Sequence, residues 1–307
     1  MTFPALTDSF RLSRLQPPAA DRTIRMVLDT DTYNEIDDQF AVVYALKSPE
    51  RLKVEALYAA PFFNELSDGP EDGMEKSYDE ILRILNRLGK PADGFVFKGS
   101  RSYMPGPGEP VRSEAAVDLI RKAKASPDDD PLYVVAIGAI TNVASAILLE
   151  PDIIRNIVVV WLGGHALHWP HTKEFNLHQD VHAARVVLDS GVPLVLVPCM
   201  GVASHLLTSL AEVRTHLQGT SPIGDFLHET FERCSGDHFG YSRVIWDIST
   251  IAYLLQPDWV PTTLEFSPLL TDQATWSADQ SRHLIRCAYF AHRDPIFRDL
   301  FRKLSPP

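Results

Sequence analysis

Four aspartates near the start of the sequence are spaced so that they could bind a metal ion together. Asp29 and Asp31 follow the short apolar run Met26–Leu28, and the adjacent Asp37 and Asp38 open a mostly apolar segment that is typical of a helix. Carboxylates this close repel one another unless a positive charge lies among them. Hard oxygen ligands in this number suit Ca²⁺ or Mg²⁺ better than zinc or copper. The alternative is a solvated acidic loop that caps the N-terminus of the following helix, where negative charge is stabilising.

Another aspartate, Asp247, lies much later in an otherwise apolar segment. Trp246 precedes it, and Ile248 and Ile251 follow it. A carboxylate in such surroundings is costly to bury unless it is paired or bound to a metal ion. The sequence therefore indicates Asp247 as a further candidate ligand.

Three histidines, His165, His168 and His171, occur close together and by their spacing could bind zinc. No cysteine or further acidic residue completes a tetrahedral site locally, so contacts to a substrate base or structural hydrogen bonds are the favoured roles.

The segments that must position these residues alternate between strand and helix up to about residue 210. Strands are predicted at the apolar runs Met26–Leu28, Leu52–Ala60, Gly94–Gly99, Leu132–Ile137, Ile157–Leu162 and Val192–Pro198. Helices are predicted at Gln39–Leu46, Glu75–Leu88, Glu114–Ala123, Val143–Leu149 and His182–Leu188. This alternation predicts an α/β fold, with a mostly parallel, Rossmann-like central sheet and helices on both faces. Ligands bind outside the carboxyl ends of such strands, which is where Asp29 and Asp31 stand.

The remaining segments complete a single-domain prediction. Residues 1–22 are expected to form an N-terminal arm, and residues 23–307 one domain. The polar segment Ser67–Gly73 is expected to be a loop. Two late strands are predicted between Pro261 and Cys287, followed by an amphipathic helix at Asp294–Leu304.

Composition excludes several classes of function. The formal charge of −11 argues against nucleic acid or an anionic membrane as a partner. No run of about twenty apolar residues occurs, so no membrane span is expected. Three widely spaced cysteines without a C-x-x-C pattern fit a reduced, cytoplasmic protein better than a disulfide framework.

Four motifs together resemble the inosine-uridine nucleoside hydrolase family. They are the D-x-D strand end with its Asp-Asp pair, the segment GAITN at Gly138–Asn142, the sequence EFNLHQDVHAA from Glu174, and the late Asp247. The sequence departs from the family in a longer first loop, Thr32–Ile36, and in Trp246, which stands where many relatives have histidine. The resemblance implies a nucleoside hydrolase fold and hydrolysis of the N-glycosidic bond of ribonucleosides to ribose and a free base, as in purine and pyrimidine salvage.

The resemblance also implies site residues, carried over by position. Ca²⁺ would be bound by Asp31, Asp38, Asp247 and the backbone carbonyl of Thr141. The ribose hydroxyls would be held by Asp37, Asn64, Glu174 and Asn176, although an asparagine such as Asn64 is also common in turns. Asp31 would accept the proton of the attacking water, and Asp29 would support the loop. Within the longer loop, Asn34 and Glu35 are expected in or next to the ligand shell.

The acid that protonates the leaving base is predicted among residues preceding Asp247. His238 and Tyr241 are the candidates, and His165 and His168 are the alternatives, with His165 also expected to contact the substrate. Because Trp246 replaces the usual histidine, a non-catalytic nucleoside- or ribose-binding relative is an open alternative. A haloacid-dehalogenase-like phosphatase is another, although the later lysine and acidic pair that it needs are missing from GAITN and Gly163-Gly164. The expected partner is a small-molecule ribonucleoside, and the expected assembly is a homodimer or homotetramer.

Overall fold

A single eight-stranded sheet forms the centre of the molecule. The computed structural model describes residues 3–305, and its strands lie in the order β3-β2-β1-β4-β5-β6-β12-β9. Every neighbouring pair is parallel except β12 and β9, which are antiparallel. The strands span Ile24–Thr30 (β1), Leu52–Ala59 (β2), Val96–Lys98 (β3), Leu132–Ala136 (β4), Ile157–Leu162 (β5), Leu194–Val197 (β6), Thr262–Phe266 (β9) and Leu284–Ala288 (β12). The predicted mostly parallel sheet is therefore confirmed.

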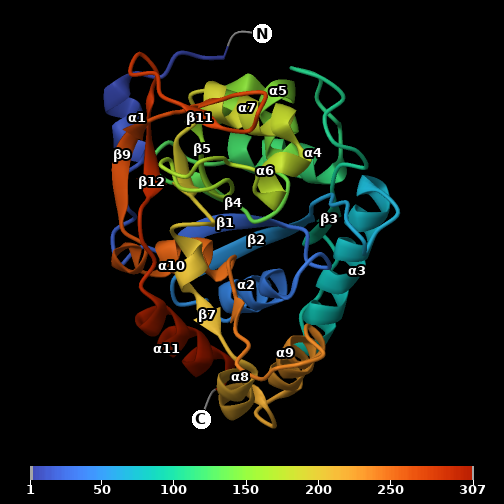
Figure 1. The fold of residues 1–307 in the computed structure, drawn as a ribbon. Coiled ribbons are helices and arrows are strands. Elements are labelled where there is room, and N and C mark those ends of the chain that lie inside the picture. The colour runs from blue at the N-terminus through green and yellow to red at the C-terminus, as the bar shows by residue number, and fades with distance from the viewer. Residues whose placement is uncertain (1–2, 306–307) are drawn as a thin grey trace.

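Helices cover both faces of this sheet (Figure 1). On one face lie α4 (Glu114–Lys124), α5 (Thr141–Leu149), α6 (Phe175–Gln179) and α7 (Val181–Asp189). On the other lie α2 (Ile36–Leu46), α3 (Pro70–Arg87), α8 (Leu210–Leu217), α9 (Pro222–Arg233), α10 (Ile248–Leu255) and α11 (Arg293–Leu304). Two short pairings, β7 (Leu207–Thr208) with β8 (Arg243–Val244) and β10 (Leu269–Leu270) with β11 (Trp276–Ser277), lie outside the main sheet.

Two apolar cores form because successive side chains of a strand point to opposite faces. In β1, Met26 and Leu28 belong to the core beneath α2 and α10, whereas Val27 belongs to the core beneath α5 and α7. Strands buried on both faces read as continuous apolar runs in the sequence, which is why they were predictable. No helix among residues 3–305 has the length and apolar character needed to cross a membrane.

The structure corrects one predicted loop and gives form to the predicted arm. Helix α3 begins at Pro70, so the C-terminal part of Ser67–Gly73 is helical. Proline suits the first position of a helix, where its missing N–H leaves no hydrogen bond unmade. In the N-terminal segment, α1 (Asp8–Arg14) packs onto the domain, and the Arg11 guanidinium donates a 3.2 Å hydrogen bond to the carbonyl of Gly191.

Gly73 fixes how closely α3 approaches the chain that follows β2. A Cβ atom at this position would lie 2.0 Å from the carbonyl oxygen of Phe62. Gly73→Ala should therefore lower the free energy of unfolding by about 1–3 kcal/mol, measured by urea denaturation. An ordinary helical glycine would instead gain about 0.5–1 kcal/mol from this change. Gly236→Ala is the control, since nothing lies within 4 Å of its added Cβ. Equal stability of the two variants would show that α3 is not held at this distance.

Candidate active site

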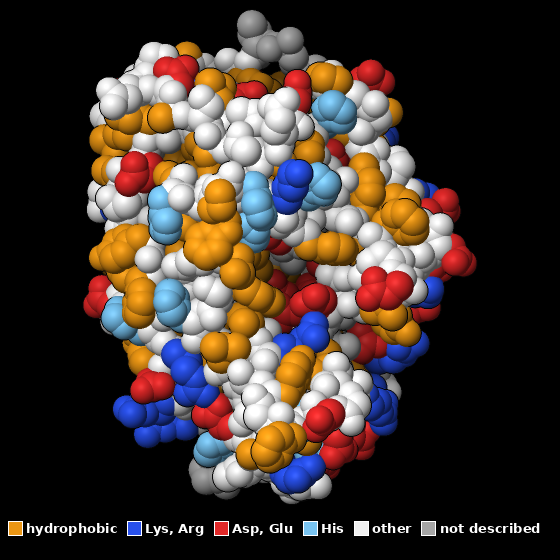
Figure 2. All heavy atoms as spheres, viewed as in Figure 1, with side chains coloured by type: hydrophobic (Ala, Val, Ile, Leu, Met, Phe, Trp, Pro, Cys, Tyr) orange, Lys and Arg blue, Asp and Glu red, His pale blue; other side chains and the backbone are white. Residues whose placement is uncertain are grey.

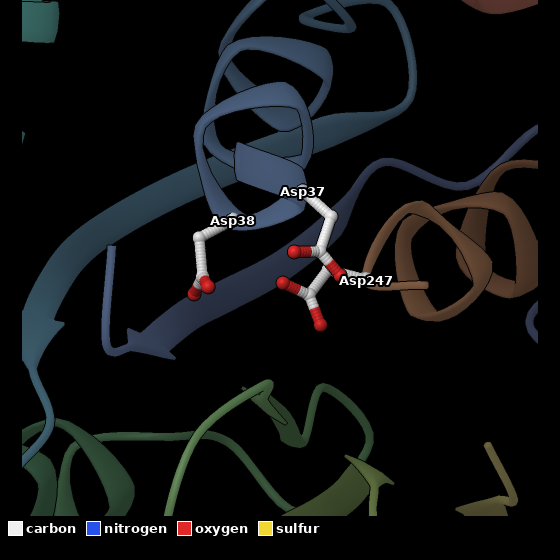
Figure 3. A group of neighbouring side chains, drawn as sticks. All are labelled: Asp37, Asp38 and Asp247. Carbon is white, nitrogen blue, oxygen red and sulfur yellow. The ribbon is translucent and has the colours of Figure 1, made fainter. Parts of the chain in front are cut away.

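Three aspartates from two distant parts of the sequence meet at the carboxyl edge of the sheet. Asp37 and Asp38 lie in the first turn of α2, and Asp247 caps the start of α10. Figure 3 shows their carboxylates directed toward a common centre. One oxygen atom from each lies within 4.8 Å of the others, and all three residues are buried. The structure thus brings Asp38 and Asp247, two predicted ligands, together with Asp37, which was predicted to bind ribose.

This acidic cluster is electrostatically unfavourable without a cation. Burial raises the pKa of Asp37, Asp38 and Asp247, and that of Asp38 is raised to about 7. Within residues 3–305, Oδ1 of Asp37 and both carboxylate oxygens of Asp31 are buried without a hydrogen-bond partner. Buried oxygens of this kind fit a hard divalent cation. The cluster can therefore hold a metal ion.

Asp31 lies beside the cluster, immediately after β1, and is fully buried. Its carboxylate approaches Gly138 so closely that a Cβ on that glycine would lie 2.7 Å from Oδ1. Its pKa is raised by burial first and then by the charge of Asp38. Asp29 has a different role, because its Oδ1 accepts a 2.8 Å hydrogen bond from the side-chain amide of Asn142. This bond connects the end of β1 to α5.

Thr141 begins α5, and its hydroxyl donates a 2.7 Å hydrogen bond to Asp180. Thr141 is not among the residues that line the cavity described below. Asp180 also accepts a hydrogen bond from the backbone N–H of Ala183, so it is the N-cap of α7.

The longer first loop is fastened at two points. The side-chain amide of Asn64 donates a 2.6 Å hydrogen bond to the side-chain oxygen of Asn34. The next residue, Glu35, forms a 3.1 Å ion pair with Arg243 of β8. Asn34 and Glu35 both line the cavity, whereas Asn64 does not line it and instead contacts Asn34.

A cavity of about 250 Å³ opens against the acidic cluster, a size that suits a small molecule. Its lining includes Glu174 and Asn176, the predicted ribose contacts. Glu174 accepts hydrogen bonds of 2.8–3.0 Å from the backbone N–H groups of Gly164, Asn176 and Leu177, so it caps α6. The side-chain amide of Asn176 donates to the carbonyls of Ile137 and Leu162, both at 3.1 Å.

The histidine candidates divide into two groups. His165 lines the cavity, and its ring centroid lies 5.5 Å from that of His171. His238 does not line it, because its Nε2 atom lies 2.9 Å from the carbonyl oxygen of Glu232 and its ring packs against Tyr241. Tyr241 is likewise outside the cavity lining. Among residues 3–305, the histidines at 165, 168 and 171 form no metal-binding group.

Sequence reasoning missed three residues near the substrate space. Lys173 and Cys199 line the cavity, and Arg243 pairs with Glu35 at its edge. The position of Lys173 next to Glu174 was a usable signal. No local pattern pointed to Cys199 or Arg243, because tertiary packing alone brings them to the site.

Comparison with known proteins decides the family. The model of the inosine-uridine preferring nucleoside hydrolase family matches residues 26–284 of this chain. The chain belongs to this family. The predicted N-ribosyl hydrolase is thereby confirmed, and nothing supports the haloacid-dehalogenase alternative. A relative within the family is the pyrimidine-specific ribonucleoside hydrolase RihA of Citrobacter koseri, 30% identical over 259 residues, which cover 75% of this chain and 78% of the relative.

Solved structures of nucleoside hydrolases share the fold. The plant enzyme PpNRh1 superposes with a TM-score of 0.73 at 19% identity, covering 93% of this chain and 100% of that one. The purine-preferring ribonucleoside hydrolase from Gardnerella vaginalis gives a TM-score of 0.72 at 21% identity, covering 92% of this chain and 98% of that one. These matches confirm the predicted nucleoside hydrolase fold.

The charge of the acidic cluster gives a prediction about stability. Asp247→Asn should raise the free energy of unfolding of the metal-free protein by about 1–2 kcal/mol, because it removes one of several buried like charges. Because the pKa of Asp247 is raised well above its usual value by burial and then by Asp37 and Asp38, this penalty is absent in acid and grows as pH rises above about 4. Urea denaturation should therefore show a larger gain at about pH 7.5 than at about pH 5.

Asp118→Asn is the matched control for this substitution. Asp118 is also buried, but its Oδ2 lies 3.0 Å from Nζ of Lys122 and accepts a hydrogen bond from Tyr58. Its removal leaves a buried cation without a partner and should cost about 3 kcal/mol. Destabilisation of the metal-free protein by both substitutions would contradict the repulsion assigned to the cluster.

Proposed function

We propose that this chain catalyses the calcium-dependent hydrolysis of the N-glycosidic bond of ribonucleosides. The observation that carries the proposal is the buried acidic cluster facing a small-molecule cavity, in a chain of the nucleoside hydrolase family. The cytoplasmic location and the homodimeric or homotetrameric assembly stay predictions.

The proposed cation is held by Asp31, Asp38 and Asp247, with the Thr141 carbonyl as a further ligand. Oxygen donors without hydrogen-bond partners at Asp31 support a hard ion such as Ca²⁺. When bound, such an ion supplies a positive charge that orients the ribose hydroxyls and makes water a stronger acid. Since Asp37 is within the same cluster, its unpartnered Oδ1 is available to the ribose 2′-hydroxyl.

The remaining ribose contacts come from the opposite wall. A carboxylate offers about four acceptor positions, and Glu174 uses three of them for backbone N–H groups. The Cys199 thiol also hydrogen-bonds to this carboxylate, so a ribose hydroxyl would take the place of the thiol at the fourth position. Asn176 is held rigidly at the ends of β4 and β5, which suits a residue that positions substrate.

Asp31 is proposed as the general base. It takes a proton from the attacking water while bond breaking builds positive oxocarbenium character on the ribose. The other carboxylates of the cluster stabilise that developing charge. No hydroxyl or amide of the described chain donates to Asp31, so its oxygens are free to accept the water proton.

The leaving base is the part of the reaction in which this chain differs from many relatives. His165 lines the cavity and is proposed to contact a bound base, whereas the predicted acids His238 and Tyr241 are not among the lining residues. Trp246 contributes an aromatic wall at this point. Were turnover absent, these placements would fit the alternative of a metal-dependent nucleoside-binding protein, in which no acid protonates the base.

Ribose release from a panel of ribosides tests the proposal. With Ca²⁺ present, we expect release from uridine, inosine and p-nitrophenyl riboside, and loss of all three activities on chelation. The p-nitrophenyl leaving group needs no acid, so turnover of this compound alone would mean that base protonation is deficient. Calcium binding with no release from any of them would contradict the hydrolase and support the binding protein.

Asp31→Asn should lower kcat by about 100- to 10,000-fold, the usual contribution of a general base, with a smaller change in KM. Single-turnover measurement on p-nitrophenyl riboside gives the chemical step directly. The control is Asp272→Asn, which alters an exposed carboxylate paired with Arg185. Full activity of Asp31→Asn would assign the base to another residue.

A further inference from the structure

The walls of the substrate cavity differ in charge. Five carboxylates line it, from Glu35, Asp37, Asp38, Glu174 and Asp247, and Lys173 and His165 line it as well. Figure 2 shows acidic side chains inside the central hollow, with histidine and Lys or Arg side chains along its upper rim and Lys or Arg side chains also at its lower edge. Ribose hydroxyls and a neutral base require acceptors and donors, but they do not require a full positive charge.

The side chain of Lys173 is available to bind a ligand. Among residues 3–305 its ammonium group forms no ion pair or hydrogen bond, whereas six other lysines pair with carboxylates: Lys53, Lys76, Lys98, Lys122, Lys124 and Lys303. Its backbone is nevertheless held, because its N–H donates to the ring of His171 and the next residue caps α6. The side chain is thus anchored at its base.

His165 adds a hydrogen-bond donor on the same side. Its Nδ1 accepts a 3.4 Å hydrogen bond from the backbone N–H of Met200, which places the ring proton on Nε2. Within the described chain, Nε2 has no partner. Burial, and then the neighbouring His171, lower the pKa of His165, which favours its neutral ring.

We infer that the substrate is a ribonucleoside bearing an anionic substituent, a phosphate or a carboxylate, bound by Lys173 and His165. The inference rests on the proposed function and specifies its substrate class. The protein carries a formal charge of −11, so an anionic substrate is repelled at long range unless a local cation receives it. An ammonium group and a neutral N–H donor are suited to phosphate or carboxylate oxygens.

Three substrates separate the two sources of the anion. Uridine is neutral, uridine 5′-monophosphate carries a phosphate on the ribose, and orotidine carries a carboxylate on the base. We expect kcat/KM, with Ca²⁺ present, to be about 10- to 100-fold higher for one of the anionic compounds than for uridine. The preferred compound identifies the substituent. In Lys173→Met this ratio should fall to about one, and high salt should reduce it in the wild type.

Lys90→Met is the matched control, since Lys90 is exposed and does not line the cavity. The ratio should be unchanged in this variant. Turnover of uridine without preference for either anionic compound, or a preference that survives Lys173→Met, would overturn the inference and leave the hydrolase intact. Calorimetric binding of the same compounds gives the ratio independently of turnover. A chain that cleaves none of them would overturn the proposed function, while the binding ratio still decides the role of Lys173.

Discussion

Repulsion among buried carboxylates is the constraint on which the site depends. Asp31, Asp37, Asp38 and Asp247 are taken out of water at one edge of the sheet, and burial makes each of them harder to ionise. Within residues 3–305, no lysine forms an ion pair with these carboxylates. The positive charge of Arg243 acts on Asp37 and lowers its pKa, but Arg243 is itself paired with Glu35. The fold therefore keeps a strained negative site in place, and a divalent ion is the simplest means of relieving it.

The surrounding structure holds the site in position through hydrogen bonds in which at least one partner is a side chain. Asn142 connects Asp29 to the start of α5, and Asn176 spans the ends of β4 and β5. The Trp246 backbone N–H donates a hydrogen bond to Asp37, so Trp246 also positions the cluster. Such bonds act at the strand ends, where a rigid sheet fixes the cavity walls.

Much of this arrangement could be read from the sequence. The apolar run of β5 predicts its ends at Ile157 and Leu162. Every residue of a strand buried on both faces is apolar, so the run stops where the strand stops. Asp38 and Asp247 were recognised from their motifs. Motifs could not tell that His238 hydrogen-bonds to Glu232, or that Lys173 lines the cavity, because both depend on how loops pack. The start of α3 was placed too late, since the acidic first turn after Pro70 resembles a polar loop.

The cluster also connects two segments that lie far apart in the sequence. The hydrogen bond between Trp246 and Asp37 spans 209 positions in the sequence, and an ion bound among the aspartates would bridge the same two segments. It would act as a reversible cross-link closing a very long loop. The entropic cost of closing a loop rises only slowly with its length, but this one exists only after β1, α2 and α10 have come together. An ion held in this way belongs to the last stage of folding. It would slow the opening of the native molecule more than it speeds its formation.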